Sequence, residues 1–321
     1  MTLMPHSRAK CHAHALLCMV LVLITSACGT GIEVTEHVTD KDVRRVMEKN
    51  GADRPTVTLP PFEDPLTSWR EGKRFWVTDD QVRELMLNQQ DCNLDSVHLA
   101  GHVLSFLGSE ATPLFADDDH RIDIRFEDVA DGRCYVYRFG LAQHADRSFL
   151  NLPMLVDMDL VSHVARHVQS KDYYIRTSIW YDRDNEQMMA GRHFIKVHID
   201  SVLPGNNVLP LKVFFTAIDS GEKAMVWMSD NASTMHGRDF DALFVASDPH
   251  LSYPLIGDDN WQMITRGQVA AGMTKEECLL SLGTPGSIVE RPDQAGLREY
   301  WYYDGGSYLY FVDGLLSQFR R

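Results

Sequence analysis

Two histidines spaced four residues apart are the first candidates for chemistry in this chain. His163 and His167 fall within a predicted helix, where this spacing puts both imidazoles within reach of one metal ion. They flank the apolar stripe of that helix, no Glu or third His has a matching spacing, and no HExxH motif occurs. A polar helix rim is therefore the favoured interpretation, and we expect no metal and no cofactor.

Two acidic runs are candidate cation sites. Residues 117–120 (Asp-Asp-Asp-His) concentrate three carboxylates in a loop, and a weak Ca²⁺ site is one interpretation. Residues 182–186 alternate acids but lack the glycine and the distant glutamate of an EF-hand loop. Because neither spacing directs successive side chains to one ion, we interpret both runs as solvated turns.

Motifs for nucleophilic catalysis and for phosphate binding are absent from the sequence. It contains no GxSxG, no CxxC, and no cysteine with an evident histidine partner. The glycine-containing run 283–286 follows a predicted helix instead of opening one, so it does not match a phosphate loop. We therefore expect a protein that is not an enzyme, since any catalytic site would have to be assembled from scattered residues.

The C-terminal tail carries a high density of aromatic side chains. Eight of the 31 aromatic residues lie in the last 22 positions, on predicted antiparallel strands. Alternation places Trp301 and Tyr303 on one face of the sheet, opposite Tyr300 and Tyr302. One face must cover two predicted helices, so the aromatic residues of the other face are a surplus suited to a partner surface. The candidate partner-binding residues are Tyr300, Tyr302, Tyr308 and Tyr310.

The N-terminus has the pattern of a secretory signal peptide. A weakly basic leader precedes ten apolar residues at positions 15–24. Such a run spans about 15 Å as a helix, about half of the hydrocarbon thickness of a bilayer, so it is too short to cross a membrane. Residues 26–29 (Ser-Ala-Cys-Gly) resemble the end of a bacterial lipobox. The resemblance implies lipidation of Cys28 with chains such as palmitate and, because Gly29 follows instead of Asp, anchoring in the outer membrane.

Charge and cysteine usage indicate the compartment and the partners. Removal of residues 1–27 leaves 294 residues and changes the net charge from −14 to −16. An acidic surface repels phosphate backbones, which argues against nucleic acid as a partner. The soluble body is then expected to reach the membrane through its lipid anchor and to face the periplasm.

Three other cysteines, Cys92, Cys134 and Cys278, remain after Cys28 takes the lipid. One option is a disulfide between Cys92 and Cys134. The favoured interpretation is that these cysteines are small buried apolar side chains.

The body is expected to be an α+β fold with two small β-rich units, barrel- or sandwich-like, followed by a helix-helix-antiparallel-sheet domain. Prolines interrupt the tether before residue 65, and a helix at 157–168 with an apolar stripe closes the first β-rich unit. The predicted strands of the two units are 73–77, 98–107, 122–126, 134–139, 173–180, 194–199, 211–217 and 223–228. The predicted organisation is a signal peptide (1–27), a tether (28–64), two β-rich domains (65–170 and 171–257) and an α+β domain (258–321).

The last sixty residues carry the clearest local signals. Thr274 and Glu277 have the spacing of a capping box, and Gly283 with Pro285 ends the helix that it starts. Asp313-Gly314 is a hairpin turn signal between the last two predicted strands. The order of two short helices followed by an antiparallel sheet is therefore predicted from local chemistry.

The segment from residue 261 to residue 319 resembles the SmpA/OmlA-like domain of the small lipoprotein of the outer-membrane β-barrel assembly machinery. The matching elements are Gly272-Met273-Thr274-Lys275-Glu276-Glu277, Leu282-Gly283-Thr284-Pro285, Glu299-Tyr300-Trp301-Tyr302-Tyr303 and Tyr310-Phe311-Val312-Asp313-Gly314-Leu315. The resemblance covers about a fifth of the chain and implies an envelope interaction module without catalysis. Other secreted proteins and lipoproteins share this fold, so the fold does not fix the function.

Two functions of different class follow. The first is a non-enzymatic outer-membrane lipoprotein that binds outer-membrane or envelope proteins, in outer-membrane protein assembly or envelope integrity. The alternative is a periplasmic ligand-binding or hydrolytic protein that uses residues 65–257, with the C-terminal domain as a docking accessory. A deep polar pocket between those residues would favour the alternative, and an exposed aromatic sheet face would favour the first.

Overall fold

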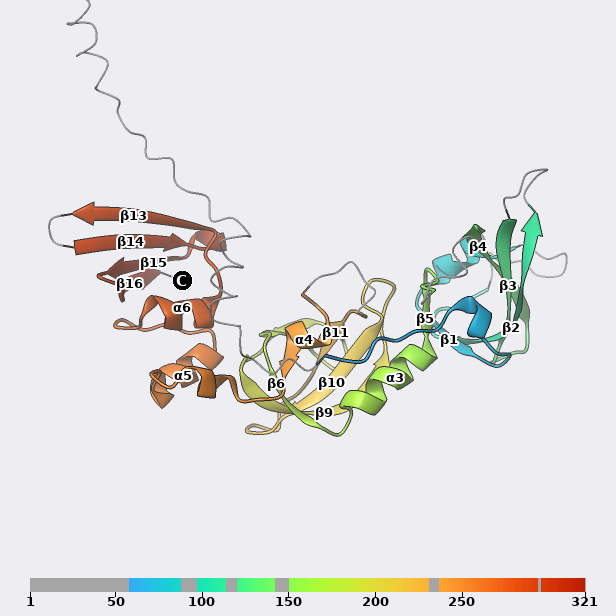
Figure 1. Cartoon of the computed structure of the whole chain (residues 1–321), viewed down its shortest axis with the longest axis horizontal. Coiled ribbons are helices and arrows are strands. Elements are labelled where there is room, and N and C mark those ends of the chain that lie inside the picture. The colour runs from blue at the N-terminus through green and yellow to red at the C-terminus, as the bar shows by residue number, and fades with distance from the viewer. Residues whose placement is uncertain are drawn as a thin grey trace, which may run out of the picture.

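The computed structural model describes residues 58–87, 97–113, 120–141, 150–230, 237–293 and 296–320. The predicted signal peptide, Cys28, most of the predicted tether, Cys92 and the acids at 117–119 lie outside these residues. The described part is an α+β fold in which three antiparallel sheets follow one another along the long axis of the molecule (Figure 1). No helix in the described part is both long and apolar enough to cross a membrane.

The first sheet has five strands in the order β4-β3-β2-β1-β5, and aromatic rings fill its core. The Trp69 ring contacts Phe75 and Phe106 at centroid distances of 4.9 and 5.4 Å. A 3-10 helix η2 (Asp80–Leu85) follows β1, and the Asp79 side chain caps it by accepting from the Gln81 N–H. The strands are β1 (Arg74–Val77), β2 (Val103–Pro113), β3 (His120–Asp128), β4 (Cys134–Leu141) and β5 (Leu155–Asp157).

The second sheet has seven strands in the order β12-β6-β9-β10-β11-β7-β8. The predicted strand 173–180 is wrong as one element, because it is divided into β6 and β7, which pair with different neighbours. Local hydrogen bonds at Thr177 cause the break: its hydroxyl accepts from the Ile179 N–H, and its carbonyl accepts from the Trp180 indole. The strands are β6 (Asp172–Ile175), β7 (Ile179–Tyr181), β8 (Met188–Ala190), β9 (Ile195–Pro204), β10 (Leu211–Ala217), β11 (Lys223–Met228) and β12 (Phe244–Val245).

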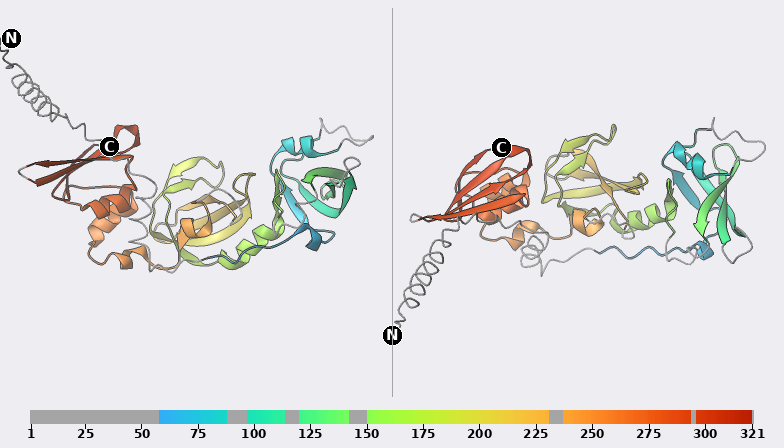
Figure 2. Two further views of the ribbon diagram at one scale, coloured as in Figure 1. Left: turned by 45° about the horizontal axis from the view of Figure 1, so that its top comes forward. Right: turned by 90° about the horizontal axis from the view of Figure 1, so that it is seen from above.

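Both of these sheets are open, whereas the sequence pattern favoured a barrel or a sandwich. Within the described residues, the end strands of each sheet do not pair with each other, which closure into a barrel would require. The register shifts between β2 and β3 and between β9 and β10 mark bulges that curve a sheet, and Figure 2 shows both sheets curved. Each sheet therefore needs another element to cover its apolar face.

Helix α3 (Met158–Val168) covers the second sheet, although the sequence pattern assigned it to the first. The Asp157 side chain caps it by accepting from the Asp159 N–H, and its predicted apolar stripe is confirmed. The buried side chains of that stripe belong to the same core as the strands β6, β9 and β10. The position of this helix in the sequence suggested the first unit, but its apolar side chains are buried against the second sheet. The buried stripe residues are Leu160, Val161, Val164 and Val168.

The last seven residues of the predicted tether, 58–64, are packed against the body. We call them the entry segment. Leu59 is 7% exposed in the core of the second sheet, and Phe62 packs against the same core. The Pro60 carbonyl lies 3.0 Å from His163 Nε2 on α3. Figure 1 shows the segment in blue, running beside α3 from the second sheet towards the first.

The C-terminal region has the predicted order of two helices followed by an antiparallel sheet. This third sheet has the strand order β13-β14-β15-β16. The capping box of α6 is confirmed: the Thr274 hydroxyl accepts from the Glu277 N–H, and the Glu277 carboxylate accepts from the Thr274 N–H. The N-cap of α5 is Gly257, and Asp258 lies in its first turn. The elements are α5 (Asp258–Thr265), α6 (Lys275–Leu282), β13 (Ser287–Asp293), β14 (Gly296–Tyr302), β15 (Tyr308–Val312) and β16 (Leu315–Arg320).

A compact aromatic joint connects the second sheet to these helices. It includes α4 (Phe240–Leu243) and the 3-10 helix η5 (Pro249–Ser252) on the connecting chain. The rings of Phe194 and His250 both stack on Trp261 of α5, at centroid distances of 5.7 and 4.4 Å. His193 is buried and its Nε2 lies 3.0 Å from the Leu280 carbonyl of α6. The third sheet is thus fixed to the second through buried side chains.

Candidate functional site

The four candidate tyrosines lie together on one face of the third sheet. The register of β14 and β15 places Tyr300 directly opposite Tyr310 and Tyr302 directly opposite Tyr308. The Tyr300 ring lies 4.6 Å from that of Tyr310 and 6.4 Å from that of Tyr302, measured between centroids. The predicted placement of these residues on one face is confirmed. We call this surface the tyrosine face.

The opposite face of the same sheet supplies the core. Trp301, Leu309 and Phe311 are buried with Met273 and Cys278 from the α6 side. Figure 1 shows α6 and α5 on this side of the sheet only. Because the helices take up one face, the tyrosine face is left as the sheet's outer surface in the described part of the chain. Tyr302 is 43% exposed, and the other three tyrosines are half-buried against their neighbours.

Two tight turns fix the register that pairs these rings. Asp313 and Gly314 both have positive φ, 51° and 83°, which gives the two-residue turn expected between β15 and β16. Gly305 and Gly306, with φ of 76° and 82°, form the turn between β14 and β15. A slip of one residue would exchange the tyrosines with Trp301 and its buried neighbours, so these glycines position the site.

The charges of this sheet are divided between its faces. Glu299 is 3% exposed on the helix side, where it accepts from the Lys275 ammonium and from the Trp301 indole. Arg291 lies on the tyrosine face, and its guanidinium is 5.8 Å from the centre of the Tyr300 ring. Its cross-strand partner is Arg298, which shares that face. The tyrosine face therefore combines aromatic rings with guanidinium groups.

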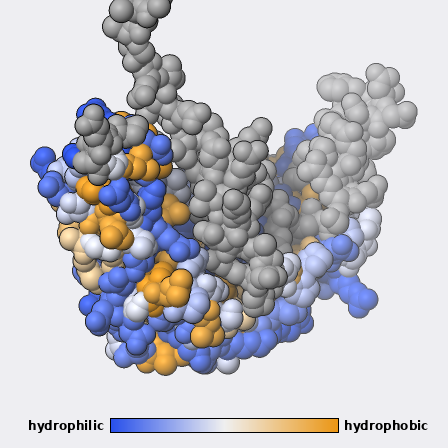
Figure 3. All heavy atoms as spheres, turned by 60° about the vertical axis from the view of Figure 1, so that its left-hand side comes forward, coloured by the Kyte–Doolittle hydropathy of each residue, from blue (hydrophilic) through white to orange (hydrophobic). Residues whose placement is uncertain are grey.

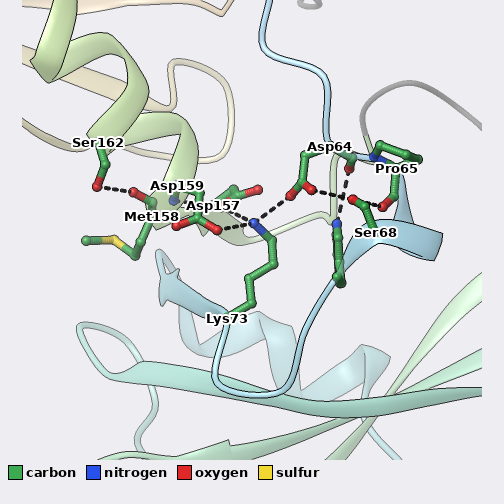
Figure 4. Close-up of polar contacts among 9 residues, drawn as sticks. Asp64, Pro65, Ser68, Lys73, Asp157, Met158, Asp159 and Ser162 are labelled. Carbon is green, nitrogen blue, oxygen red and sulfur yellow. Dashed lines mark hydrogen bonds and ion pairs between the residues drawn. The ribbon is translucent and has the colours of Figure 1, made fainter.

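A second polar cluster, which the sequence did not indicate, surrounds Lys73 (Figure 4). Its ammonium lies 2.7 Å from an oxygen of Asp64 and 2.8 Å from oxygens of both Asp157 and Asp159. The ammonium also lies 5.3 Å from the centre of the Phe75 ring. The cluster therefore ties together the entry segment, the chain before β1, and the start of α3.

The protonation of this cluster points to a structural role. Burial alone would lower the pKa of Lys73, but the charge of Asp157 and the hydrogen bonds that the ammonium donates to three carboxylates raise it above its usual value. Burial raises the pKa of Asp157, and this effect exceeds the stabilisation of its charge by Lys73. A lysine that stays protonated at neutral pH and donates to three carboxylates is no nucleophile. We interpret the cluster as an ion-pair hub between elements.

The predicted histidine pair is a helix rim. His167 Nδ1 lies 2.7 Å from the His163 carbonyl, and the two rings are 4.6 Å apart between centroids. His163 Nε2 is directed to the entry segment at Pro60. Among the described residues, no group of three or more His, Cys, Asp or Glu could hold a metal ion.

The acidic run 182–186 forms the turn between β7 and β8, as predicted. The Asp182 carboxylate accepts from the N–H groups of Asp184 and Asn185, and these bonds lower its pKa. Glu186 closes the turn with positive φ and pairs with Lys212. The carboxylate oxygens are thus turned to backbone donors and a lysine, and no ion is needed to explain the run.

Two Asp–His contacts on the first sheet escaped the sequence patterns. His98 Nδ1 lies 2.6 Å from Asp80, and His102 Nδ1 lies 2.6 Å from Asp128. Bonds from backbone N–H groups lower the pKa of Asp80 to about 2. A catalytic triad also needs a nucleophile on the second ring nitrogen. In the described part of the chain, no hydroxyl or thiol bonds to either ring.

A cavity of about 270 Å³ lies under the entry segment, between α3 and the ends of β10 and β11. Prolines of the entry segment form one wall, and apolar side chains of α3 form another. Its size is just below the range of about 300–1,000 Å³ that is usual for small-molecule sites. The polar side chains at its margin include His163, Ser229 and Asp230.

The two described cysteines differ in exposure. Cys278 is buried in the α6 core, and burial raises the pKa of its thiol to about 12. Cys134 is exposed and free at the start of β4, so the expectation that the cysteines are buried is wrong for this residue. The Cys134 thiol is therefore accessible to solvent at the first residue of β4. Its suggested disulfide partner, Cys92, lies outside the described residues.

No protein-family model matches the chain, and comparisons with curated proteins and with solved structures find no match. The surface itself is informative. Figure 3, which brings the side of the third sheet forward, shows apolar residues as separate patches among hydrophilic ones. Among the described residues, the most exposed large apolar side chain is Leu255, at 99%, on the chain that leads to α5. The tyrosine face combines aromatic area with ordered geometry.

Proposed function

We propose that the chain is a non-enzymatic outer-membrane lipoprotein whose C-terminal sheet binds an envelope protein. In this proposal Cys28 carries the lipid, the body faces the periplasm, and residues 258–321 form an SmpA/OmlA-like module. Outer-membrane protein assembly and envelope integrity are the processes that such a module would serve. The observation that carries the proposal is the tyrosine face, with its four paired rings on a sheet face that the module's own helices leave open.

The chemistry of tyrosine supports a protein partner. A tyrosine ring offers a large contact area and loses little side-chain entropy on binding, and its hydroxyl supplies a hydrogen bond. Tyr, Trp and Arg are the residue types that dominate the binding energy of protein interfaces. Here the rings are held against each other on a sheet whose register is fixed by turns, so the surface is organised before it binds.

The alternative is a ligand-binding or hydrolytic protein that acts through residues 65–257. The cavity under the entry segment is the observation that bears on it. That cavity is small, and its polar residue His163 is directed to the backbone of Pro60. The Asp–His contacts of the first sheet lack a nucleophile among the described residues. The aromatic surface therefore supports the interaction function better.

The test is a crosslinked pull-down of the full-length protein from intact cells. The test variant is Tyr302→Ser with Tyr308→Ser, which removes two rings of the tyrosine face. The matched control is Met188→Ser, because Met188 is 72% exposed on β8 of another sheet. We expect outer-membrane or envelope proteins with the unmodified chain and with the control, and their loss with the double variant. Recovery of the same partners by all three proteins would contradict the proposal.

A further inference from the structure

We infer that the outer edge of β16 accepts an extended segment of the partner protein, which adds to the third sheet as a further strand. This inference rests on the proposed function and specifies how the partner binds. Three features carry it: the protection of the other described sheet edges, the open backbone of β16 after its first residues, and the exposed ring of Phe319.

Each of the three sheets has two end strands, and in the described part of the chain five of these six strands are protected against pairing. The strands β5, β8 and β12 have only two or three residues each. The middle of β4 is covered, because the Leu87 N–H donates to the Val136 carbonyl. The strand β13 contains Pro292, which has no N–H, and three charged residues. Shortness, cover, proline and charge are the usual protection of an edge strand.

The sixth end strand, β16, lacks this protection along most of its length. It has six residues, of which only Arg320 is charged and none is proline. Its outer side is covered only at its start, where the Leu316 carbonyl accepts from the Gly272 N–H and the Leu316 N–H donates to the Met273 carbonyl. No other described segment pairs with the outer side of residues 317–320. The groups that satisfy an open row of backbone N–H and C=O groups are those of another extended chain.

The ring of Phe319 supplies an apolar contact for an added strand. Phe319 is 44% exposed and lies directly opposite Leu309, which is 2% exposed in the core of the third sheet. Phe319 is therefore on the helix side of the sheet, where it extends the apolar core to the open edge. A strand that pairs with β16 would cover this ring with an apolar side chain of its own.

The other side of the same edge is polar and adjoins the tyrosine face. Gln318 is exposed and lies directly opposite Tyr310. Because the side chains of a strand alternate between the two faces, we expect the added segment to carry apolar residues beside Phe319 and polar residues beside Gln318. The formal net charge of −14 opposes pairing with a second copy of the chain, so the occupant is a segment of a different protein.

The first test places the photo-crosslinking residue benzoylphenylalanine at position 318 or at position 320 of the full chain in living cells. These two exposed positions share one face of β16 and are about 6.7 Å apart along the strand. The crosslinked residues of the partner are identified by mass spectrometry. We expect the centres of the two crosslinked sites to be about two residues apart, because an added strand has the same rise per residue.

A partner helix along the edge would give crosslinked sites about four residues apart, since a helix rises about 1.5 Å per residue. That spacing would overturn the inference. Crosslinks to a second copy of the chain, or to another segment of the same chain, would also overturn it.

The second test is Phe319→Lys in the crosslinked pull-down. A lysine at this position removes the apolar contact and adds the charge that edge strands use against pairing. We expect recovery of the partner to fall about tenfold, equivalent to about 1.4 kcal/mol of binding free energy. The matched control is Ile179→Lys, because Ile179 is 42% exposed on β7 of another sheet, and it should leave recovery unchanged. Circular dichroism checks that both variants are folded, and the crosslinking test depends on neither.

The outcomes separate the open edge from the tyrosine face. Full recovery with Phe319→Lys, together with loss of the partner in the Tyr302→Ser and Tyr308→Ser double variant, would overturn this inference and leave the proposed function in place. Full recovery with both variants, or no envelope protein with the unmodified chain, would overturn both.

Discussion

Removal of the Lys73 side chain charge should destabilise the protein strongly. Lys73 is 9% exposed and its ammonium is 2.8 Å from Asp157, which is 4% exposed. In Lys73→Met, the Asp157 carboxylate keeps a backbone N–H but loses its cation, and its second oxygen is already buried without a hydrogen-bond donor. Loss of one partner of a buried ion pair costs about 3–5 kcal/mol, because the remaining charge stays out of water.

The assay is urea unfolding followed by tryptophan fluorescence, with Trp69 beside the cluster as a reporter. For a slope of about 2 kcal/mol per molar urea, a loss of about 3–5 kcal/mol lowers the midpoint by about 1.5–2.5 M. The control is Lys196→Met, because Lys196 is 48% exposed and its ion pair is solvated. It should leave the midpoint close to that of the unmodified protein.

The pH dependence and the double variant complete this test. Asp157→Asn removes the charge while its side-chain oxygen can still cap α3, so adding it to Lys73→Met should restore part of the stability. The deficit of Lys73→Met should also shrink as the pH falls, because protonation of Asp157 removes the unpaired charge. In the unmodified protein the raised pKa of Lys73 contributes stability that is present below its unfolded value of 10.5 and is lost above the folded value. A midpoint for Lys73→Met within about 0.3 M of the unmodified protein would refute the ion-pair hub.

Three further predictions concern packing, pH and thiol chemistry. Gly191→Ala should destabilise the second sheet by about 1–3 kcal/mol in urea unfolding, because a Cβ would lie 2.1 Å from Cδ2 of the buried Trp180 ring. Burial lowers the pKa of His193, so its contribution to stability is present above pH 6.5 and is lost as the pH falls towards the folded value. In the native protein, Ellman's reagent should react quickly with Cys134, and with Cys278 only after unfolding, because the latter thiol is buried with a raised pKa.

Each of these three predictions has a control or an outcome that would contradict it. Gly286→Ala adds a Cβ at an ordinary contact distance of 3.6 Å from the Tyr302 carbonyl oxygen and should cost little, so equal losses at both glycines would contradict the packing argument. His193→Gln should remove the part of the pH dependence below pH 6.5 that belongs to this residue. An unchanged profile would show that another group titrates there. Rapid labelling of Cys278 in the folded protein would contradict its burial.

The predictable parts of this fold are those that depend on neighbours in sequence. The capping box of Thr274 and Glu277 and the Asp313-Gly314 turn are built from residues within a few positions of one another, and both are confirmed. Strict alternation along β14 and β15 likewise placed Tyr300 and Trp301 on the two different faces of the sheet. These signals also located the candidate site. The face of the sheet that packs against two helices must be apolar, so the aromatic residues on the other face are left for a partner.

The parts that could not be predicted depend on contacts between distant segments. The pairing of Lys73 with Asp64 and Asp157 joins residues up to 93 positions apart, and each looks like a solvated surface charge in the sequence. The apolar stripe of α3 fits either sheet equally well, and only the tertiary structure shows which one it covers. No local pattern marks the Asp–His contacts, since Asp80 and His98 meet only after the chain folds.

The central claim is that the tyrosine face is covered by a protein in the envelope. The most direct measurement is hydroxyl-radical footprinting of Tyr302, which is 43% exposed, in intact outer membranes and in the purified protein. Tyr181 on β7 serves as the internal reference, because it lies on the second sheet. We predict that Tyr302 is protected several-fold in membranes while the labelling of Tyr181 is unchanged. Equal labelling of Tyr302 in both preparations would contradict the claim.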